Sequence, residues 1–385
     1  MRFSVDAHSI GQRLTGNEVY IRSLLNGFAQ LDPEAEFVAY VSEPDVNGWV
    51  PPGFLKRHVA GNRYWRLGFD LSVCLRRDRP DLIHVQYNGP LFCPVPMVVT
   101  VHDVSFIEHP EYFRTGQACQ LRLSTGNTLR RAAKILTISE FSRQRLSRAF
   151  GLDPEEIVVT PLGAQQHFRP GNRAQAIDRL RRTLGIERPF LLNVGDLQPR
   201  KNQVGLIRAF CELVRCQPQL PHLLVLAGKE TWFSPRIREE IRRSGQAERI
   251  RVTGFVSEED LAALYRAADL FVFPSFYEGF GLPVIEAMAS GRAVICSNTS
   301  SLPEVADAAA LLIDPRSTGE IVRAMRDVLL DGELRERLER HSLQRARLFS
   351  WRETARQTLE VYYAVADGRR RTLSPAPEPA RVEHG

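Results

Sequence analysis

The sequence predicts an α/β protein with two Rossmann-like, doubly wound domains, each a parallel sheet covered by helices. The chain has 385 residues, more than one domain usually holds. Short apolar segments alternate with amphipathic ones along it. That alternation breaks between Pro161 and Gly171, where turn residues precede an arginine-rich stretch. We therefore expect an N-terminal domain at residues 1–175 and a C-terminal domain at 176–350, facing across a cleft.

In the N-terminal domain the first expected strand, residues 3–5, leads through a loop with Gly11 and Gly16 to a helix at 17–29. Ile21, Leu24 and Phe28 share one face of that helix. Further strands are expected at 37–41, 82–85, 97–101, 135–138 and 157–160, with helices near 65–76, 116–132 and 140–150.

The C-terminal domain repeats the alternation. Strands are expected at 190–194, 223–227, 250–252, 270–273, 293–296 and 310–313. Helices are expected at 202–214, 257–267, 283–290, 318–330, 333–348 and 351–366. The segment 368–385, with three arginines and several prolines, is typical of a disordered tail.

Composition favours a soluble protein. The net charge of +6 is small for this length and does not indicate nucleic-acid binding. The basic stretch from Arg122 to Arg148 is either a solvated helical face or a surface for an anionic partner such as phospholipid. The six cysteines lack paired spacing, and neither a signal peptide nor a membrane span is evident. We expect a cytoplasmic protein, with peripheral contact at the inner face of the membrane as an option.

The turn from Glu278 to Glu286 follows an apolar strand and contains Gly279 and Gly281 before Pro283 opens a helix. Free N–H groups at such a helix start bind phosphate oxygens, and the two carboxylates accept bonds from sugar or ribose hydroxyls. The alternative is a plain strand–turn–helix corner with two solvated glutamates.

Two other turns lie where a strand of the C-terminal domain meets a helix. Gly195 leads to Arg200 and Lys201, which could neutralise a diphosphate or form a solvated basic pair. Phe255 and Val256 follow Gly254, and their backbone could pair with a nucleobase or only precede a helix cap.

The N-terminal domain offers fewer candidates. Gly16 lies where a phosphate loop would be, but the full GxGxxG pattern is missing. His102 directly follows a strand and could contact a sugar hydroxyl, carry a proton, or bond backbone as a structural histidine. No DxD pair that would hold a metal–nucleotide complex is present.

Together these motifs resemble glycosyltransferase family 4, retaining enzymes with the GT-B fold. Residues 278–286 match the E-x7-E signature of that family, 195–202 its diphosphate turn and 254–257 its base-contacting turn. The segments 102–106 and 110–113 are similar to the mannosyltransferase-type members. The resemblance implies that a C-terminal helix at about 351–367 crosses back to the N-terminal domain.

The resemblance further implies retaining, metal-independent sugar transfer, preferably mannose from GDP-mannose, to a glycan or lipid-linked acceptor. No cofactor is implied beyond the nucleotide-sugar donor. Arg200 and Lys201 would hold the diphosphate, and Glu286 the ribose. With Arg200 and Lys201, the implied catalytic residues are Glu278, at the donor sugar and phosphate, and His102, which contacts the sugar near the reaction centre. The other implied donor-binding residues are Gly279, Phe280, Gly281 and Leu282 at the sugar and phosphate, Gly16 at the diphosphate, Gly195 in the diphosphate turn, and Phe255 and Val256 at the base.

One position departs from the family pattern. Many members have two adjacent glycines in the N-terminal donor loop, whereas this chain has Thr15 before Gly16, and the Cβ of Thr15 would narrow the approach. Two other functions stay open: a GT-B sugar-nucleotide epimerase and a non-catalytic sugar-nucleotide binder. The complete set of Arg200, Lys201, Glu278 and Glu286 argues against the binder.

Overall fold

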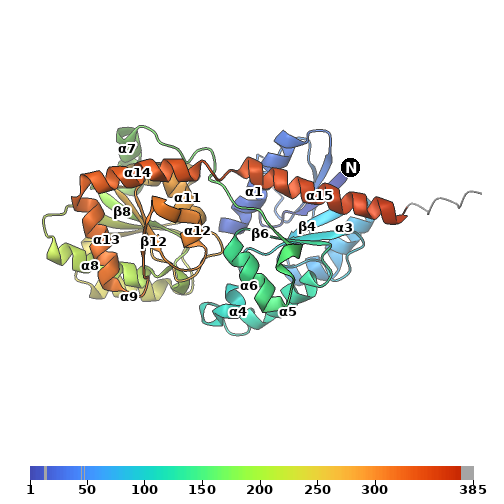
Figure 1. Cartoon of the computed structure of the whole chain (residues 1–385), viewed down its shortest axis with the longest axis horizontal. Helices are drawn as coiled ribbons and strands as arrows, with labels where there is room; N and C mark the ends of the chain where they lie inside the picture. Colours follow the sequence, from blue (N-terminus) through green and yellow to red (C-terminus); the bar gives the residue numbers. More distant parts are fainter. Residues whose placement is uncertain (13–14, 45, 47, 374–385) are drawn as a thin grey trace, which may run out of the picture. The chain divides into compact units, whose positions relative to one another are not determined.

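The structure is a computed structural model that describes residues 1–12, 15–44, 46 and 48–373. Its contacts divide the chain into two compact units, each covered by helices (Figure 1). Unit 1 comprises Met1–Thr100, Ser124–Leu136 and Ala355–Gly385, and unit 2 comprises Val101–Leu123 and Thr137–Thr354. The domain boundary predicted near residue 175 stays a prediction.

The first sheet has seven strands in the order β3-β2-β1-β4-β5-β6-β7, the arrangement of a doubly wound fold. Val5 of β1, an interior strand, pairs in parallel with Ala39 of β2 on one side and His84 of β4 on the other. The strands are β1 (Arg2–Asp6), β2 (Glu36–Val41), β3 (Leu55–His58), β4 (Leu82–Gln86), β5 (Met97–Thr100), β6 (Lys134–Thr137) and β7 (Ile157–Val159). The sequence analysis missed β3, an edge strand whose four residues are largely exposed and show no apolar alternation.

The helices of this half of the chain include the predicted ones. They are α1 (Thr15–Leu31), α2 (Arg63–Trp65), the π-helical η1 (Arg66–Asp70), α3 (Leu71–Asp78), α4 (Ser105–Glu108), α5 (Gln117–Leu129) and α6 (Glu140–Phe150), with the 3-10 turns η2 (Pro110–Tyr112) and η3 (Pro154–Glu156). Helix α1 begins before the predicted residue 17, so Gly16 lies in its first turn. Leu14 and the side chain of Thr15 lie outside the described residues.

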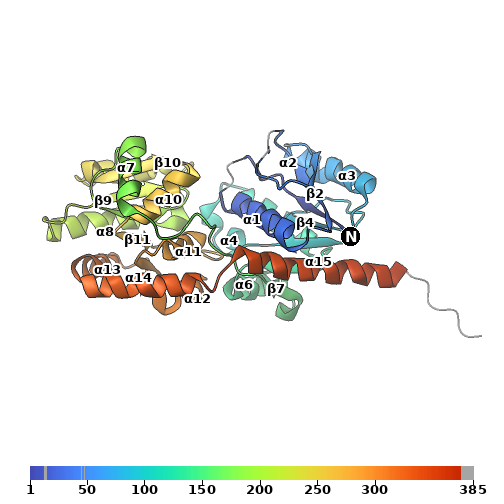
Figure 2. The same cartoon turned by 90° about the horizontal axis from the view of Figure 1, so that it is seen from above.

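The last helix, α15 (Trp351–Leu373), returns to unit 1, as predicted (Figure 2). The ring of Tyr362 lies 5.3 Å from that of Phe3 and 5.4 Å from that of Phe28. Its hydroxyl lies 2.6 Å from Nδ1 of the buried His84. The predicted tail from residue 368 overlaps the last turns of α15, and its remainder, 374–385, lies outside the described residues.

The second sheet has six strands in the order β10-β9-β8-β11-β12-β13. They are β8 (Phe190–Val194), β9 (Leu223–Ala227), β10 (Ile250–Gly254), β11 (Leu270–Phe273), β12 (Val294–Ser297) and β13 (Leu311–Ile313). Its neighbouring strands pair in parallel, so the two predicted parallel sheets are confirmed.

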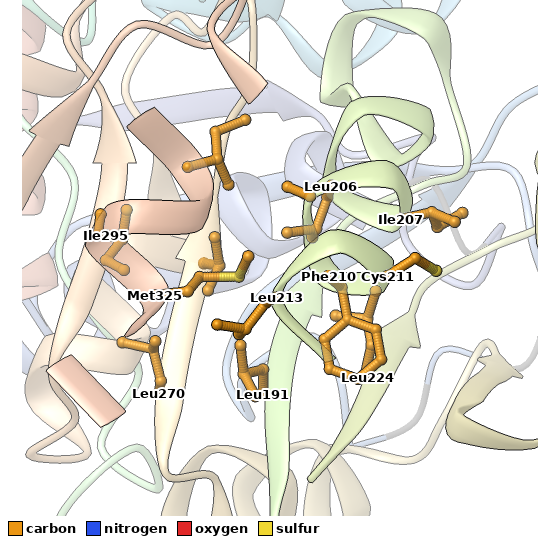
Figure 3. Close-up of a cluster of buried hydrophobic side chains, with 14 of the residues drawn as sticks. Leu191, Leu206, Ile207, Phe210, Cys211, Leu213, Leu224, Leu270, Ile295 and Met325 are labelled. Carbon is orange, nitrogen blue, oxygen red and sulfur yellow. The ribbon is translucent and has the colours of Figure 1, made fainter. Parts of the chain in front are cut away.

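Apolar side chains from α8 (Gln203–Cys216) and α13 (Thr318–Leu330) pack on the second sheet (Figure 3). Leu206, Phe210 and Leu213 of α8 join Leu224 of the sheet and Met325 of α13 in one buried cluster. This packing fixes the carboxyl ends of β8 and β11, where the candidate residues begin. The other helices are α7 (Arg173–Leu184), α9 (Ser234–Arg243), α10 (Glu258–Ala267), α11 (Leu282–Ala289), α12 (Leu302–Ala306) and α14 (Gly332–Ala346), with the 3-10 turns η4 (Pro199–Lys201), η5 (Ala247–Arg249) and η6 (Asp307–Ala309).

Candidate active site in unit 2

Glu278, in the turn between β11 and α11, forms a buried ion cluster with the basic turn after β8. One carboxylate oxygen accepts from Nη1 of Arg200 at 2.8 Å and the other from Nζ of Lys201 at 2.7 Å. Only 6% of Glu278 and 6% of Lys201 is exposed. The structure thus brings together Glu278 and the pair of Arg200 and Lys201, which the sequence analysis selected from two separate turns.

In this cluster the opposite charges favour each other, whereas the two cations oppose each other. Burial alone would raise the pKa of Glu278, but Arg200 and Lys201 outweigh it and lower that pKa to about 2. Burial, followed by the neighbouring Arg200, lowers the pKa of Lys201, and Glu278 partly opposes this. With two cations facing one carboxylate, the cluster keeps a positive excess suited to an anionic ligand.

Backbone contacts hold the Glu278 turn to the basic turn. The N–H of Phe276 donates to the carbonyl of Arg200 at 2.8 Å, and Nη1 of Arg200 donates to the carbonyl of Tyr277 at 3.1 Å. The hydroxyl of Ser300 accepts from the N–H of Glu278 at 3.1 Å, and the hydroxyl of Ser301 donates to the carbonyl of Glu278 at 3.0 Å. The turn is therefore fixed from both sides before any ligand binds.

Gly195 permits the close approach of Lys201. Its φ of +151° belongs to a region that favours glycine, and a Cβ there would lie 3.2 Å from Cε of Lys201. The ammonium of Lys201 also lies 4.8 Å from the centre of the Phe273 ring. Phe273 ends β11, so the lysine is held between both neighbouring strand ends.

The two glycines of the Glu278 turn meet different neighbours. A Cβ on Gly279 would lie 2.3 Å from the carbonyl oxygen of His102, and one on Gly281, where φ is +101°, would lie 2.5 Å from Cδ2 of Leu302. The hydroxyl of Ser139 donates to the carbonyl of Gly279 at 2.6 Å. Phe280 between them is buried, with its ring 5.6 Å from that of Phe349. A side chain at Gly279 would therefore meet backbone, and one at Gly281 would adopt an unfavourable φ and push Leu302 aside.

His102 belongs to unit 2 and lies against this turn through its backbone. The imidazole is buried, and burial lowers its pKa to about 4, with Asp103 partly opposing the shift. His102 is therefore neutral near pH 7, able to donate one hydrogen bond and accept another. Its contact with a donor sugar stays a prediction.

Glu286 lies in α11, eight residues after Glu278, in a different environment. Its carboxyl accepts a hydrogen bond from the hydroxyl of Tyr265 at 2.8 Å and is also 6% exposed. Burial raises its pKa to about 8, and the bond from Tyr265 only partly opposes this. The sequence analysis missed Tyr265, whose place on the buried face of α10 marked it only as a core residue.

The remaining predicted residues lie outside the ion cluster. Leu282 begins α11. Gly254, with φ of +71°, ends β10 and precedes Phe255, which is 52% exposed, and Val256, which is partly buried. Gly16 is exposed in unit 1. The roles of these residues toward a base or a diphosphate stay predictions.

A polar cluster in unit 1 was also missed. Asp6 ends β1, and its carboxylate lies 3.0 Å from Nδ1 of His8 and 3.6 Å from Nε of the buried Arg66. Burial would raise the pKa of Asp6, but His8 and Arg66 lower it to about 2. Tyr87, just after β4, has a φ of +57°, a strained backbone for a residue with a side chain. The sequence shows Asp6 as a carboxylate after a strand, and it gives no sign of the contact with Arg66.

Within the described ranges, no three histidine, cysteine or carboxylate side chains gather as metal ligands. All six cysteines are free. No helix in the described part of the chain is long and apolar enough to cross a membrane.

Comparison with known proteins agrees with this arrangement. Residues 176–345 match the family model described as glycosyl transferases group 1, and residues 14–165 match glycosyltransferase family 4. The chain is 36% identical over 290 residues to O-antigen chain mannosyltransferase B of Escherichia coli, covering 74% of this chain and 75% of that protein. It is 32% identical to the serotype-specific mannosyltransferase WbdA of Escherichia coli over 60% of this chain, but only 29% of that longer protein.

Solved structures share the fold at low identity. Sucrose-phosphate synthase from Thermosynechococcus elongatus superposes with a TM-score of 0.78 at 20% identity, covering 96% of this chain and all of that one. HepE of Anabaena, solved with UDP and glucose, superposes with a TM-score of 0.76 at 19% identity. The match covers 94% of this chain and 100% of the HepE chain. The sequence matches and the two doubly wound sheets together show that the chain is a glycosyltransferase of family 4 with the GT-B fold.

Proposed function

We propose that this enzyme transfers mannose from GDP-mannose to a glycan or lipid-linked acceptor, with retention of anomeric configuration and without a metal ion. The observation that carries the proposal is the preorganised cluster of Arg200, Lys201 and Glu278, whose positive excess suits a diphosphate. The choice of mannose is supported by the similarity to O-antigen chain mannosyltransferase B.

In the proposed reaction the bond between the anomeric carbon and the diphosphate oxygen breaks as the acceptor oxygen bonds that carbon on the same face. The acceptor hydroxyl proton passes to the departing phosphate oxygen. Arg200 and Lys201 donate charge-assisted hydrogen bonds to the diphosphate, which gains negative charge as it leaves. These two cations take the part that a divalent ion plays in other transferases.

Other residues would hold the rest of the donor. Glu286 would bind the ribose hydroxyls, the turn at Phe255 and Val256 the base, and His102 the sugar. A carboxyl with a pKa of about 8 is mostly protonated near pH 7, so Glu286 can donate as well as accept a bond to ribose.

A thermal-shift screen with GDP-mannose, UDP-glucose, ADP-glucose and dTDP-glucose tests the donor. A ligand at a hundredfold excess over its Kd stabilises the native state by about 2.7 kcal/mol. We expect GDP-mannose to raise the Tm most, and Arg200→Ala to abolish that shift while Arg215→Ala, an exposed arginine of α8, retains it. A larger shift with another nucleotide sugar would refute the GDP-mannose assignment.

Product analysis tests the reaction itself. With GDP-mannose and a lipid-extract acceptor we expect a mannosylated product in the presence of EDTA, and no epimerised sugar nucleotide with donor alone. Strict dependence on added metal would contradict metal independence, and inversion at the anomeric carbon would contradict retention.

We propose further that the enzyme works in the cytoplasm as a peripheral protein at the inner face of the membrane. A lipid-linked acceptor would require this location, and unit 1 offers a surface suited to it.

A further inference from the structure

Unit 1 carries a cluster of exposed apolar side chains, here called the aromatic surface. Tyr64 is 71% exposed and Phe92 67%. The complete set is Tyr64, Trp65, Phe69, Leu91 and Phe92, each more than half exposed. Single exposed apolar residues are common, but an exposed cluster of this kind marks an interaction site.

The aromatic surface is built from two segments that a backbone hydrogen bond joins. The rings of Trp65 and Phe69 lie 5.5 Å apart on the α2–η1 segment. The N–H of Leu91 donates to the carbonyl of Leu67 at 2.8 Å, which joins the loop bearing Leu91 and Phe92 to that segment. This bond therefore keeps the two segments that carry the side chains next to each other.

The start of the helical segment is also fixed. Asn62 caps it by accepting from the N–H groups of Tyr64 at 3.0 Å and Trp65 at 3.2 Å. The two rings are presented by an ordered, capped turn.

The surroundings of the aromatic surface are cationic. Arg131 donates to the carbonyl of Pro90 at 2.9 Å and to that of Leu91 at 2.6 Å. Arg63 bonds Ser124 at 3.3 Å, which links α2 to α5. The sequence has no aspartate or glutamate from residue 82 to 102 or from 112 to 139. The carboxylate of Asp70, on η1, accepts from the N–H of Ala60 at 2.7 Å.

We propose that the aromatic surface docks on an anionic phospholipid bilayer. Trp and Tyr rings favour the headgroup region, where one part of the ring is apolar and the rest is wet. Arginines beside them attract lipid phosphates, and each contributes roughly fivefold to binding. A cationic rim with few carboxylates fits a lipid surface, whereas a protein partner would need acidic groups of its own. The proposal deepens the peripheral location proposed above and does not depend on the donor or the acceptor.

Vesicle co-sedimentation of the full chain tests the proposal. The probes are vesicles of phosphatidylcholine with phosphatidylglycerol and vesicles of phosphatidylcholine alone. We expect binding to the anionic vesicles, weakening with salt, and little binding to the neutral ones. The affinity of the double variant Trp65→Ser/Phe92→Ser for anionic vesicles should fall at least roughly tenfold. That of Arg63→Gln should fall roughly fivefold.

The matched control is Trp232→Ser, which removes an exposed tryptophan from unit 2. It should bind anionic vesicles as the unchanged chain does. The proposal is overturned if the unchanged chain ignores anionic vesicles, or if the double variant binds as tightly as the control. An unchanged Tm of the double variant without ligand would show that the fold survives, and a loss of vesicle binding alone leaves the sugar-transfer proposal intact.

Discussion

The turn at Glu278 and the helix at Glu286 contain two equally buried glutamates with opposite protonation. Glu278 meets Arg200 and Lys201, and its pKa is about 2. Glu286 meets the hydroxyl of Tyr265, and its pKa is about 8. Burial raises the pKa of both carboxyls, so the partners make the difference. Of the two glutamates in the signature, Glu278 is therefore ionised at pH 7 and Glu286 is mostly protonated.

The largest expected effect comes from the cations of the turn. Arg200→Ala or Lys201→Ala should reduce turnover by orders of magnitude, because each removes charge-assisted bonds to the leaving diphosphate. Steady-state kinetics with GDP-mannose measures this, with Arg215→Ala as the control. If both variants kept near-normal rates, the assignment of the cluster to the leaving group would be wrong.

Replacing the anion should affect stability. Glu278→Gln leaves the buried Lys201 beside the partly buried Arg200 without a counter-charge and should lower the free energy of unfolding by about 3–5 kcal/mol. In the unchanged chain, the stabilisation from Glu278 is present above pH 4.5 and is lost as pH falls toward 2, because its folded pKa is depressed. Urea unfolding of both proteins at pH 7 and at acid pH measures the difference, which should shrink at low pH. A constant difference would contradict the ionised state of Glu278.

Glu286 should show the opposite pH dependence. Its folded pKa is raised, so its stabilisation is complete below pH 4.5 and is lost as pH rises toward 8. The unchanged chain should therefore lose stability relative to Glu286→Gln over that window, by up to about 1.4 kcal/mol per pH unit. Paired urea titrations from pH 5 to pH 8.5 test this. A pH-independent difference would indicate that Glu286 is already ionised in the folded state.

The tight packing of the turn is tested by Gly279→Ala. The new Cβ would lie 2.3 Å from the carbonyl oxygen of His102, so backbone must move, at a cost of about 1–3 kcal/mol. Gly332→Ala is the control, because a Cβ there would have nothing within 4 Å. Thermal unfolding of the two variants measures the difference, and equal Tm values would show that the turn is more open than the structure indicates.

Sequence reasoning reached the alternating strands and the turns at their ends because buried parallel strands read as short apolar runs. It selected Arg200, Lys201 and Glu278 from turns at strand ends, and a family resemblance then assigned their roles. Their mutual contacts became visible only in the fold. It missed the bond from Tyr265 to Glu286, since periodicity does not show which distant side chains meet.

In the basic stretch from Arg122 to Arg148, too, the sequence did not show which side chains meet. Arg143 pairs with Glu140 at 2.9 Å and Arg145 with Glu108 at 3.3 Å, so part of its charge is balanced by neighbours. The lipid-facing candidate centres on the exposed rings of α2 and η1, with Arg131 of the basic stretch beside them. The sequence pattern there predicted only a helix.

The smallest expected effect, that of Tyr265→Phe on stability, tests whether Glu286 is neutral while Glu278 is ionised. Tyr265→Phe removes the hydroxyl that bonds Glu286 but keeps the ring, which lies 5.3 Å from that of Phe168 and 5.6 Å from that of Phe271. A bond to a neutral carboxyl contributes about 0.5–1.5 kcal/mol, whereas one to a carboxylate contributes about 1.5–3 kcal/mol. We therefore expect urea unfolding at pH 6 to show a loss of about 1 kcal/mol. The loss should grow above pH 8, where Glu286 ionises and the hydroxyl would bond a charged group. A loss near 3 kcal/mol already at pH 6 would mean that both glutamates are anions and that the contrast between turn and helix is false.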